Sequence, residues 1–357
     1  MRVAFALAGL GGFNAHGAGF LAAATRWDVR PELVTATSGQ ILVLADWLAG
    51  VDPRAHLLPP AGDDTPLSQA KIVALGYPGV FRPAYGEALA RLARPYWGKD
   101  PLHMLADRLL PAQQYVPVRT EADFANAADA LNESPIGVVF NSYDPTSGDG
   151  VLYGNDAARA LLPSEKALPN RHAAKLACRA RAYDRRYVSD VRAERPIRPI
   201  TAEAVRSALW LSLYGFNGLP DGRMDGAYHR SCIVSELHGF DRVFVARPLA
   251  NGWVGRMPQN WFEVQDWSYE MWFSVGYKAE VDAMRRINDL IAAGHLTDPK
   301  FKQVELIEIE PETPAGYFHF FVERARVYDR AFAIAEEIFA RLGLPRPEDT
   351  KPGESAA

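Results

Sequence analysis

Residues 2–49, RVAFALAGLGGFNAHGAGFLAAATRWDVRPELVTATSGQILVLADWLA, contain the segments that decide the fold. Residues 2–8 and 32–37 are short, mostly apolar runs of strand length. Each run leads through glycine into a segment of helical spacing, at 15–26 and 39–49. Strand, glycine loop, helix, strand, sharp turn and helix in this order predict an α/β fold, with a mostly parallel central sheet and helices on both faces.

The rest of the chain continues this alternation of helical and strand patterns. The predicted elements are a helical insertion or cap over 51–132, a hairpin of strands 136–140 and 151–153, strands at 242–246 and 304–309, and helices at 269–293 and 321–342. We expect residues 1–342 to form one α/β domain, in which 250–342 is a C-terminal extension of helices and a strand. Residues 343–357 are polar and proline-containing and are predicted to be a disordered tail.

Composition narrows the class of protein. A chain of 357 residues with 48% hydrophobic content can bury a large core, and a net charge of -4 argues against a nucleic-acid partner. Its apolar runs are shorter than the roughly 20 residues that cross a bilayer, and the short run after Met1 is better explained as a strand than as a signal peptide. Two cysteines, Cys178 and Cys232, could pair but form no disulfide framework, so a cytoplasmic location is expected.

Ser38 lies where the second predicted strand must turn into a helix. Residues 36–40, Ala-Thr-Ser-Gly-Gln, have the position of a nucleophile elbow, in which Gly39 supports the turn, although Ala36 and Gln40 stand where the usual elbow pattern has glycine. An elbow exposes the serine hydroxyl and directs a helix N-terminus at the charge that develops on a substrate. A serine that only caps the helix is the structural alternative, and it is the commoner role for such a residue.

A glycine loop follows the first predicted strand. If the first two strands are neighbours, the amides of Gly11 and Gly12 could face an anion next to Ser38 and form an oxyanion hole, supported by Gly9. A dinucleotide-binding loop would have glycine instead of Asn14, and a phosphate-binding P-loop would have a lysine that this segment lacks. A plain packing turn is the structural alternative.

Asp225 opens a third segment of interest, Asp-Gly-Ala at 225–227. It precedes the apolar stretch 232–234 and is predicted to lie in a loop between ordered elements, where its carboxylate could face a cleft. Asp-Gly is also a common turn dipeptide, so Asp225 and Gly226 carry a functional interpretation only together with Ser38.

Taken in order, the glycine loop, the Ser38 elbow and the Asp-Gly-Ala segment resemble the patatin-like phospholipase family. That family has a glycine-rich oxyanion loop after its first strand, a Gly-x-Ser-x-Gly elbow, and a distant Asp-Gly-Gly/Ala motif. The resemblance covers about residues 3–250 of this chain. Four positions depart from the family pattern, in the loop and in the elbow: Phe13, Asn14, Ala36 and Gln40.

The resemblance implies a patatin-like three-layer fold and a Ser-Asp dyad that works without histidine. In that scheme Asp225 takes the proton of Ser38, and the amides of Gly11 and Gly12 hold the oxyanion. The order serine, acid, histidine of α/β-hydrolases is the alternative, with His229, His238 or His319 as the third member. That fold places several strands before its elbow, whereas Ser38 follows only the second strand, which favours the dyad.

Two further segments concern possible contact surfaces. Four tryptophans and several other aromatic residues between 253 and 273 could line an acyl pocket or form a subunit contact, although core packing is the simplest interpretation. Seven arginines between 179 and 198 could meet phosphate head groups of a membrane surface, although a solvated face is the simpler interpretation. The spacing of histidine and cysteine predicts no metal site.

The sequence therefore predicts a serine hydrolase of carboxylic esters that acts on lipid or other acyl-ester substrates, as a phospholipase A or lysophospholipase does. No cofactor and no nucleic-acid partner are expected, and peripheral contact with a membrane surface is compatible with this activity. Acyl transfer by the same dyad is one alternative, because both reactions share an acyl-enzyme. A binding or scaffold protein on the same fold, whose altered motifs no longer catalyse, is another.

Overall fold

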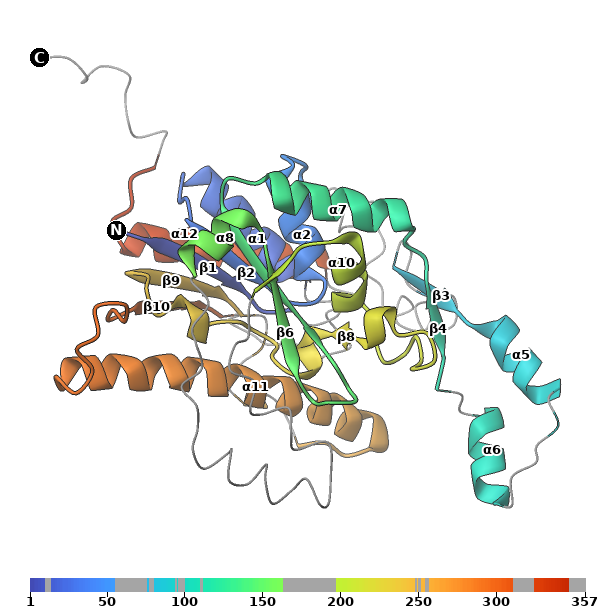
Figure 1. Ribbon diagram of the computed structural model, residues 1–357. Coiled ribbons are helices and arrows are strands. Elements are labelled where there is room, and N and C mark those ends of the chain that lie inside the picture. Colours follow the sequence, from blue (N-terminus) through green and yellow to red (C-terminus); the bar gives the residue numbers. More distant parts are fainter. Residues whose placement is uncertain are drawn as a thin grey trace, which may run out of the picture.

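The computed structural model describes residues 1–9, 14–54, 76, 80–93, 95, 100–109, 112–162, 197–247, 249, 252–253, 257–310 and 324–346. Its main feature is a mostly parallel sheet in the order β10-β9-β1-β2-β5-β6-β7, with β8 also paired to β5 (Figure 1). The strands are β1 (Val3–Leu7), β2 (Leu33–Ala36), β5 (Gly137–Tyr143), β6 (Gly150–Gly154), β7 (Arg198–Pro199), β8 (Met224–Asp225), β9 (Arg242–Ala246) and β10 (Glu305–Ile309). Strands β10, β9, β1, β2 and β5 are parallel to their neighbours in this order, while β6 and β8 run antiparallel to β5.

Helices cover both faces of the sheet. One apolar core joins the sheet to α1 (Asn14–Arg26), α2 (Gln40–Leu48), α7 (Glu121–Glu133), α10 (Ala202–Ala208) and α12 (Arg324–Arg341). A second core joins the opposite face to α8 (Asp156–Leu161) and to the long helix α11 (Trp261–Ala292), which Figure 1 shows beneath the sheet. The predicted α/β class, with a mostly parallel sheet, is therefore confirmed.

The small residues of α1 let it pack closely on its neighbours. A side chain at Gly19 would bring its Cβ to 2.3 Å from the backbone oxygen of Tyr328 in α12, and one at Gly17 would meet the side chain of Gln40 in α2. Because α12 packs on α1 and β10 closes one edge of the sheet, the predicted C-terminal extension is built into the main domain.

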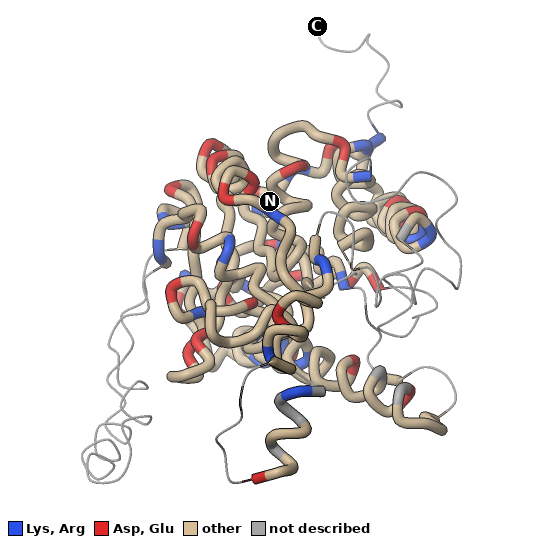
Figure 2. Tube along the Cα trace, turned by 90° about the vertical axis from the view of Figure 1, so that its right-hand side faces the viewer, with Lys and Arg blue, Asp and Glu red and all other residues tan. Residues whose placement is uncertain are grey.

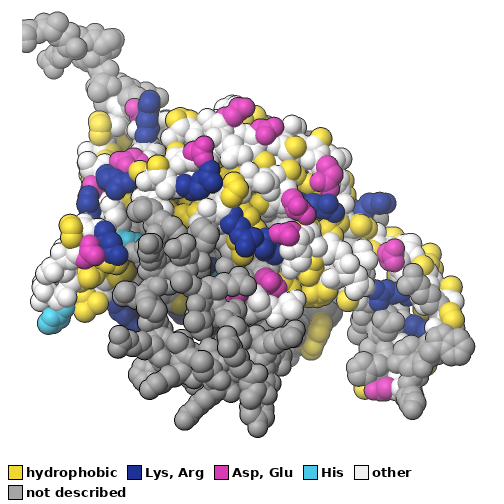
Figure 3. Space-filling model, in the orientation of Figure 1, with side chains coloured by type: hydrophobic (Ala, Val, Ile, Leu, Met, Phe, Trp, Pro, Cys, Tyr) yellow, Lys and Arg dark blue, Asp and Glu magenta, His cyan; other side chains and the backbone are white. Residues whose placement is uncertain are grey.

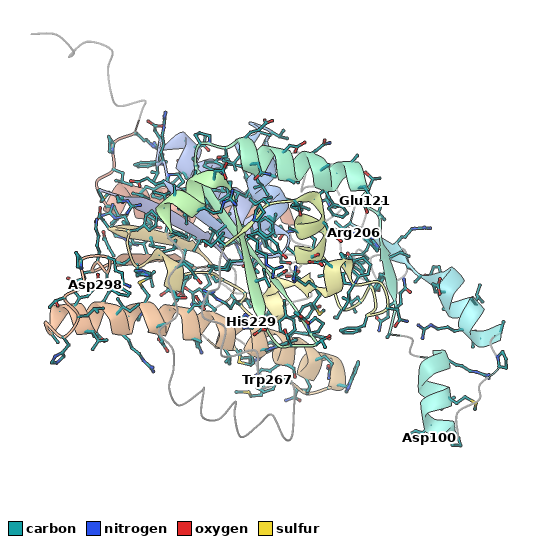
Figure 4. All side chains as sticks on the ribbon, viewed as in Figure 1. Asp100, Glu121, Arg206, His229, Trp267 and Asp298 are labelled. Carbon is teal, nitrogen blue, oxygen red and sulfur yellow. The ribbon has the colours of Figure 1, made fainter. Side chains whose placement is uncertain are left out.

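The part of the chain predicted as a helical insertion contributes several described elements. A small antiparallel sheet of β3 (Phe81–Pro83) and β4 (Tyr115–Pro117) and the helices α5 (Tyr85–Ala93) and α6 (Pro101–Leu109) lie at one end of the molecule (Figure 1). Helix α7 instead packs on α2 and α10, and Glu121 forms a 2.7 Å ion pair with Arg206 of α10 (Figure 4). Residues 121–132 thus belong to the layer on the sheet.

Most other predicted elements form close to the predicted positions. The strands at 242–246 and 304–309 and the hairpin of β5 and β6 are confirmed. Helix α11 begins eight residues earlier than the predicted 269–293, because Asn260 caps it by accepting a hydrogen bond from the Glu263 amide. Residues 347–357 of the predicted tail lie outside the described residues.

Three further observations concern the charges, the apolar helices and the cysteines of the described residues. Lys and Arg lie among Asp and Glu along the trace and on the drawn face (Figure 2, Figure 3). Within the described ranges, no helix is both long enough and apolar enough to span a bilayer. Cys232 is a buried free thiol, and Cys178 lies outside the described residues.

Candidate active site

Ser38 occupies a strained turn between β2 and α2. Its φ of +56° lies in the left-handed region that a serine seldom adopts, and among the described residues only two other non-glycine residues, Asp28 and Asp221, have a positive φ. A nucleophile elbow holds its serine in such a sharp strand-to-helix turn. The alternative role as a helix cap is wrong, because the N-cap of α2 is Gly39 and the Ser38 hydroxyl bonds elsewhere.

The Ser38 hydroxyl donates a hydrogen bond to the carboxylate of Asp225. The distance from Oγ to Oδ2 is 2.5 Å, although the two residues are 187 positions apart. The second carboxylate oxygen of Asp225, Oδ1, accepts a hydrogen bond of 2.8 Å from the Ala227 amide. Both residues are buried, Ser38 being 3% and Asp225 1% exposed. A serine hydroxyl and a carboxylate are thus paired directly, with no residue between them.

Asp225 is fixed by strand pairing and by a neighbouring asparagine. It ends the two-residue strand β8, opposite Ser142 of β5, so the expectation of a loop position is wrong. On β5, the Asn141 side-chain amide donates to the backbone oxygens of Gly226, at 3.1 Å, and Arg230, at 2.9 Å. These bonds hold the chain that follows Asp225 and so direct its carboxylate at Ser38.

Gly226 is required by this close approach to β5. A Cβ at this position would lie 2.3 Å from the Asn141 side chain and 2.5 Å from its backbone oxygen, which cannot move without disturbing β5. We expect Gly226→Ala to lower the free energy of unfolding by roughly 1–3 kcal/mol, as overpacking does, and to reduce activity because Asp225 shifts. Denaturant unfolding and ester turnover measure the two effects.

Gly86→Ala is the matched control, since a Cβ at Gly86 in α5 would meet no atom within 4 Å. That variant should be as stable as the parent or slightly more so, because alanine is the better helix former. Equal behaviour of the two variants would show that the contact between Gly226 and Asn141 does not hold Asp225.

The glycine loop begins against the elbow. A Cβ at Gly9 would lie 1.7 Å from the Thr37 backbone oxygen, so only glycine allows β1 to end so close to Ser38. The Gly9 amide donates to the Ser231 backbone oxygen at 3.0 Å, which makes Gly9 a packing residue. Gly11 and Gly12, the predicted oxyanion donors, lie outside the described residues.

Neighbouring residues accommodate the departures from the elbow pattern. Gln40 stands where the family pattern has glycine, and its side chain occupies the space that Gly17 of α1 leaves open. Asn14, which replaces a loop glycine, places its carboxamide against Gly39, where a Cβ would lie 2.1 Å from Nδ2. Glycine is therefore needed at position 39, beside Asn14, and at position 17 of α1, beside Gln40.

Burial changes the proton affinity of the candidate base. It raises the pKa of Asp225 to about 7, even though the hydrogen bonds from Ser38 and Ala227 act in the opposite direction. A carboxylate with an ordinary pKa near 4 is a weak base for a hydroxyl at neutral pH, whereas a pKa near 7 is better matched to proton transfer there.

The candidate histidines of a triad have other contacts. The His229 ring stacks on Tyr143 with centroids 5.9 Å apart, and His238 Nδ1 lies 3.0 Å from the Ser235 backbone oxygen. His319 lies outside the described residues. In a triad the histidine stands between serine and acid, whereas here the acid itself accepts the hydrogen bond of the serine hydroxyl.

Sequence reasoning missed the residues that brace the segment after Asp225. Glu280 of α11 accepts hydrogen bonds from the Val234 and Ser235 amides, each 3.1 Å, and pairs with Arg230 at 2.6 Å. The same segment also contacts β2, the strand that leads into Ser38, because Thr35 Oγ1 donates to the Ile233 backbone oxygen at 2.7 Å. Asn141, Arg230 and Glu280 stand singly in the sequence, and no local spacing marks them.

Within the ranges that the structure describes, no group of three or more His, Cys, Asp or Glu side chains is arranged to hold a metal ion. Comparison of the sequence with protein-family models finds no family that matches this chain. Comparison with curated proteins also finds no match. The assignment of Ser38 and Asp225 as a candidate active site therefore depends on the geometry of the structure.

Proposed function

We propose that this protein is a serine acyl hydrolase that cleaves carboxylic esters of lipids, with Ser38 as nucleophile and Asp225 as base. The observation that carries the proposal is the 2.5 Å hydrogen bond from a hydroxyl in a strained strand-to-helix turn to a buried carboxylate of raised pKa. Strained turns and shifted pKa values are concentrated at functional sites. The alternating layers of helix, parallel sheet and helix support a patatin-like arrangement.

In the first half of the reaction, Ser38 Oγ attacks the ester carbonyl carbon while its proton passes to Asp225. The negative charge that develops on the carbonyl oxygen is stabilised by the N-terminus of α2, which begins directly after Gly39, and by the amides of Gly11 and Gly12. The carbon–oxygen bond to the alcohol then breaks, and the alcohol takes the proton from Asp225. An acyl-Ser38 ester remains.

In the second half, a water molecule attacks the acyl carbon and gives its proton to Asp225. The bond to Ser38 Oγ breaks, the proton returns to Oγ, and the carboxylic acid leaves. Asp225 thus accepts and returns one proton in each half, which requires a pKa near the working pH. Its raised pKa of about 7 supports this role.

The experiment that tests the proposal is labelling with a fluorophosphonate probe, followed by intact-mass and peptide analysis. We expect one adduct, on Ser38, because the probe phosphonylates only an activated serine. The labelling rate should rise with pH and be half-maximal near pH 7, since Asp225 accepts a proton only when ionised. An adduct on another serine, or a rate constant that is flat from pH 5 to 9, would contradict the assignment.

A further inference from the structure

The first half of α11 exposes aromatic side chains that we expected to pack in the core. Trp261 is 67%, Trp272 50% and Val275 66% exposed, so that expectation is wrong for this part of the aromatic cluster. Phe273, in the same turn as Trp272, is buried against the body of the protein. The helix therefore has an inner side in the core and an outer apolar side in solvent.

The exposed residues follow one face of the helix. The exposed Trp261, Val264, Trp272 and Val275, together with the half-buried Ser268, are spaced by three, four, four and three residues, which aligns them along an α-helix. Trp267 and Met271 flank this row, and the seven residues together are here termed the α11 aromatic face. None of them is charged, and the Ser268 hydroxyl donates to the Val264 backbone oxygen.

The α11 aromatic face stops where the helix runs along the sheet. Beyond Val275 the exposed residues include Lys278, Asp282 and Arg285, as the solvent side of a surface helix normally does. Tyr277 hydrogen-bonds Glu308 and Asn288 bonds Val304, so this second half lies beside β10. The first half of α11, which carries the aromatic face, thus extends past the carboxyl end of β10. Because β10 and β2 point in the same direction in the sheet, this is also the edge at which β2 leads into Ser38.

The α11 aromatic face adjoins the candidate active site. Trp272 lies 5.6 Å, ring to ring, from Tyr228, which belongs to the turn that begins with Gly226. The Ser231 hydroxyl donates to the Phe273 backbone oxygen at 3.1 Å, which fixes this part of α11 to the segment that follows Asp225. Figure 4 shows Trp267 below His229, at this end of the helix.

We propose that the α11 aromatic face binds the surface of zwitterionic lipid bilayers or micelles and holds the active site against them. The inference rests on the proposed function for the identity of the substrate, which would be drawn from the aggregate. Tryptophan is enriched where proteins meet the interfacial region of a membrane, because its ring is apolar and its N–H stays hydrated. A helix with such a face lies in the plane of that interface.

Shape and charge favour lipid over a second copy of the chain. Trp261 to Val275 spans about 21 Å of a single convex helix, whereas a stable dimer buries about 800 Å² on each partner. The face has no charged side chain, and the nearby acids Glu263 and Glu270 offer nothing to anionic head groups. Binding should therefore depend on apolar burial and only weakly on salt.

The test measures co-sedimentation with phosphatidylcholine vesicles, using Ser38→Ala protein as the host so that no turnover occurs. We expect the host to bind, and the added pair Trp261→Glu and Val275→Glu to weaken binding roughly tenfold or more, since binding scales with the apolar area buried. Leu290→Glu is the matched control, because Leu290 is a 46% exposed apolar residue of α11 outside the face. It should bind as the host does.

Other outcomes would overturn the inference. They are a host that does not bind, a double variant that binds as well as the host, and binding that requires anionic lipid and disappears in high salt. Sedimentation velocity tests whether a second copy of the chain binds this face instead. A host that is dimeric while the double variant is monomeric would mean that the face is a subunit contact. A host that fails to bind beside a wild type that hydrolyses soluble esters would leave the proposed function intact. Vesicle binding by the host beside a wild type without any esterase activity would support lipid binding by the α11 aromatic face and contradict the proposed function.

Discussion

Replacing Ser38 with alanine is expected to abolish ester hydrolysis and labelling by a fluorophosphonate probe. Without the hydroxyl no acyl-enzyme forms, and loss of a serine nucleophile lowers turnover by roughly 10⁴-fold or more. Turnover of a short-chain nitrophenyl ester, and the mass of the protein after probe treatment, measure the two losses. Full activity in this variant would remove Ser38 from the mechanism.

Two companion variants separate loss of chemistry from loss of structure. Ser38→Gly should be equally inactive but more stable, because glycine adopts the φ of +56° without the strain that serine or alanine bears there. Ser207→Ala removes another buried hydroxyl, which belongs to α10 and donates to the Pro220 backbone oxygen, and this variant should retain activity. A stable, inactive Ser38→Gly beside an active Ser207→Ala would assign the loss to the nucleophile.

Asp225→Asn should lower acylation by roughly 100- to 10,000-fold, the range typical of loss of a general base. The amide keeps the shape of the carboxylate but cannot take the Ser38 proton. His229→Gln, His238→Gln and His319→Gln, made one at a time, should keep most activity, since Ser38 already donates to Asp225. An active Asp225→Asn together with one inactive histidine variant would favour a triad.

The same substitution should stabilise the protein at alkaline pH. The folded state holds the Asp225 proton up to about pH 7, whereas an unfolded aspartate loses it near pH 4. The wild type should therefore lose stability as the pH rises between these values, because the unfolded state gains free energy by ionising Asp225 whereas the folded state keeps the buried carboxyl protonated. We expect the advantage of Asp225→Asn to grow by roughly 2 kcal/mol between pH 5 and pH 8, measured by denaturant unfolding.

Local pattern was sufficient to predict much of the fold. The elements within 2–49 form within two residues of their predicted ends, because their apolar spacing and glycine stops are local signals. Strand β1 lies beside β2, as the proposed juxtaposition of the glycine loop and Ser38 requires. Boundaries set by a side-chain cap were less visible, as the early start of α11 at its Asn260 cap shows.

The exposure of the α11 aromatic residues could not be predicted from the sequence. Aromatic density indicates burial because most such residues fill cores, and the spacing of Trp261, Val264 and Trp272 is the same for a buried stripe as for an exposed one. Which turns of a helix are covered by the sheet depends on where the strand beside the helix ends. For α11 this strand is β10, which lies some 30 residues later in the chain.

The sequence by itself determined the strand-to-helix turn at Ser38 and the glycines that such a turn needs, because backbone conformation and periodicity depend on neighbouring residues. Only the tertiary structure decided that Ser38 and Asp225 meet, that burial shifts the pKa of Asp225, and that Asn141 and Glu280 hold the segment that follows Asp225. These relations join residues that are distant along the chain. They arise only when β8 pairs with β5 and α11 packs beneath the sheet, and water is excluded from between them.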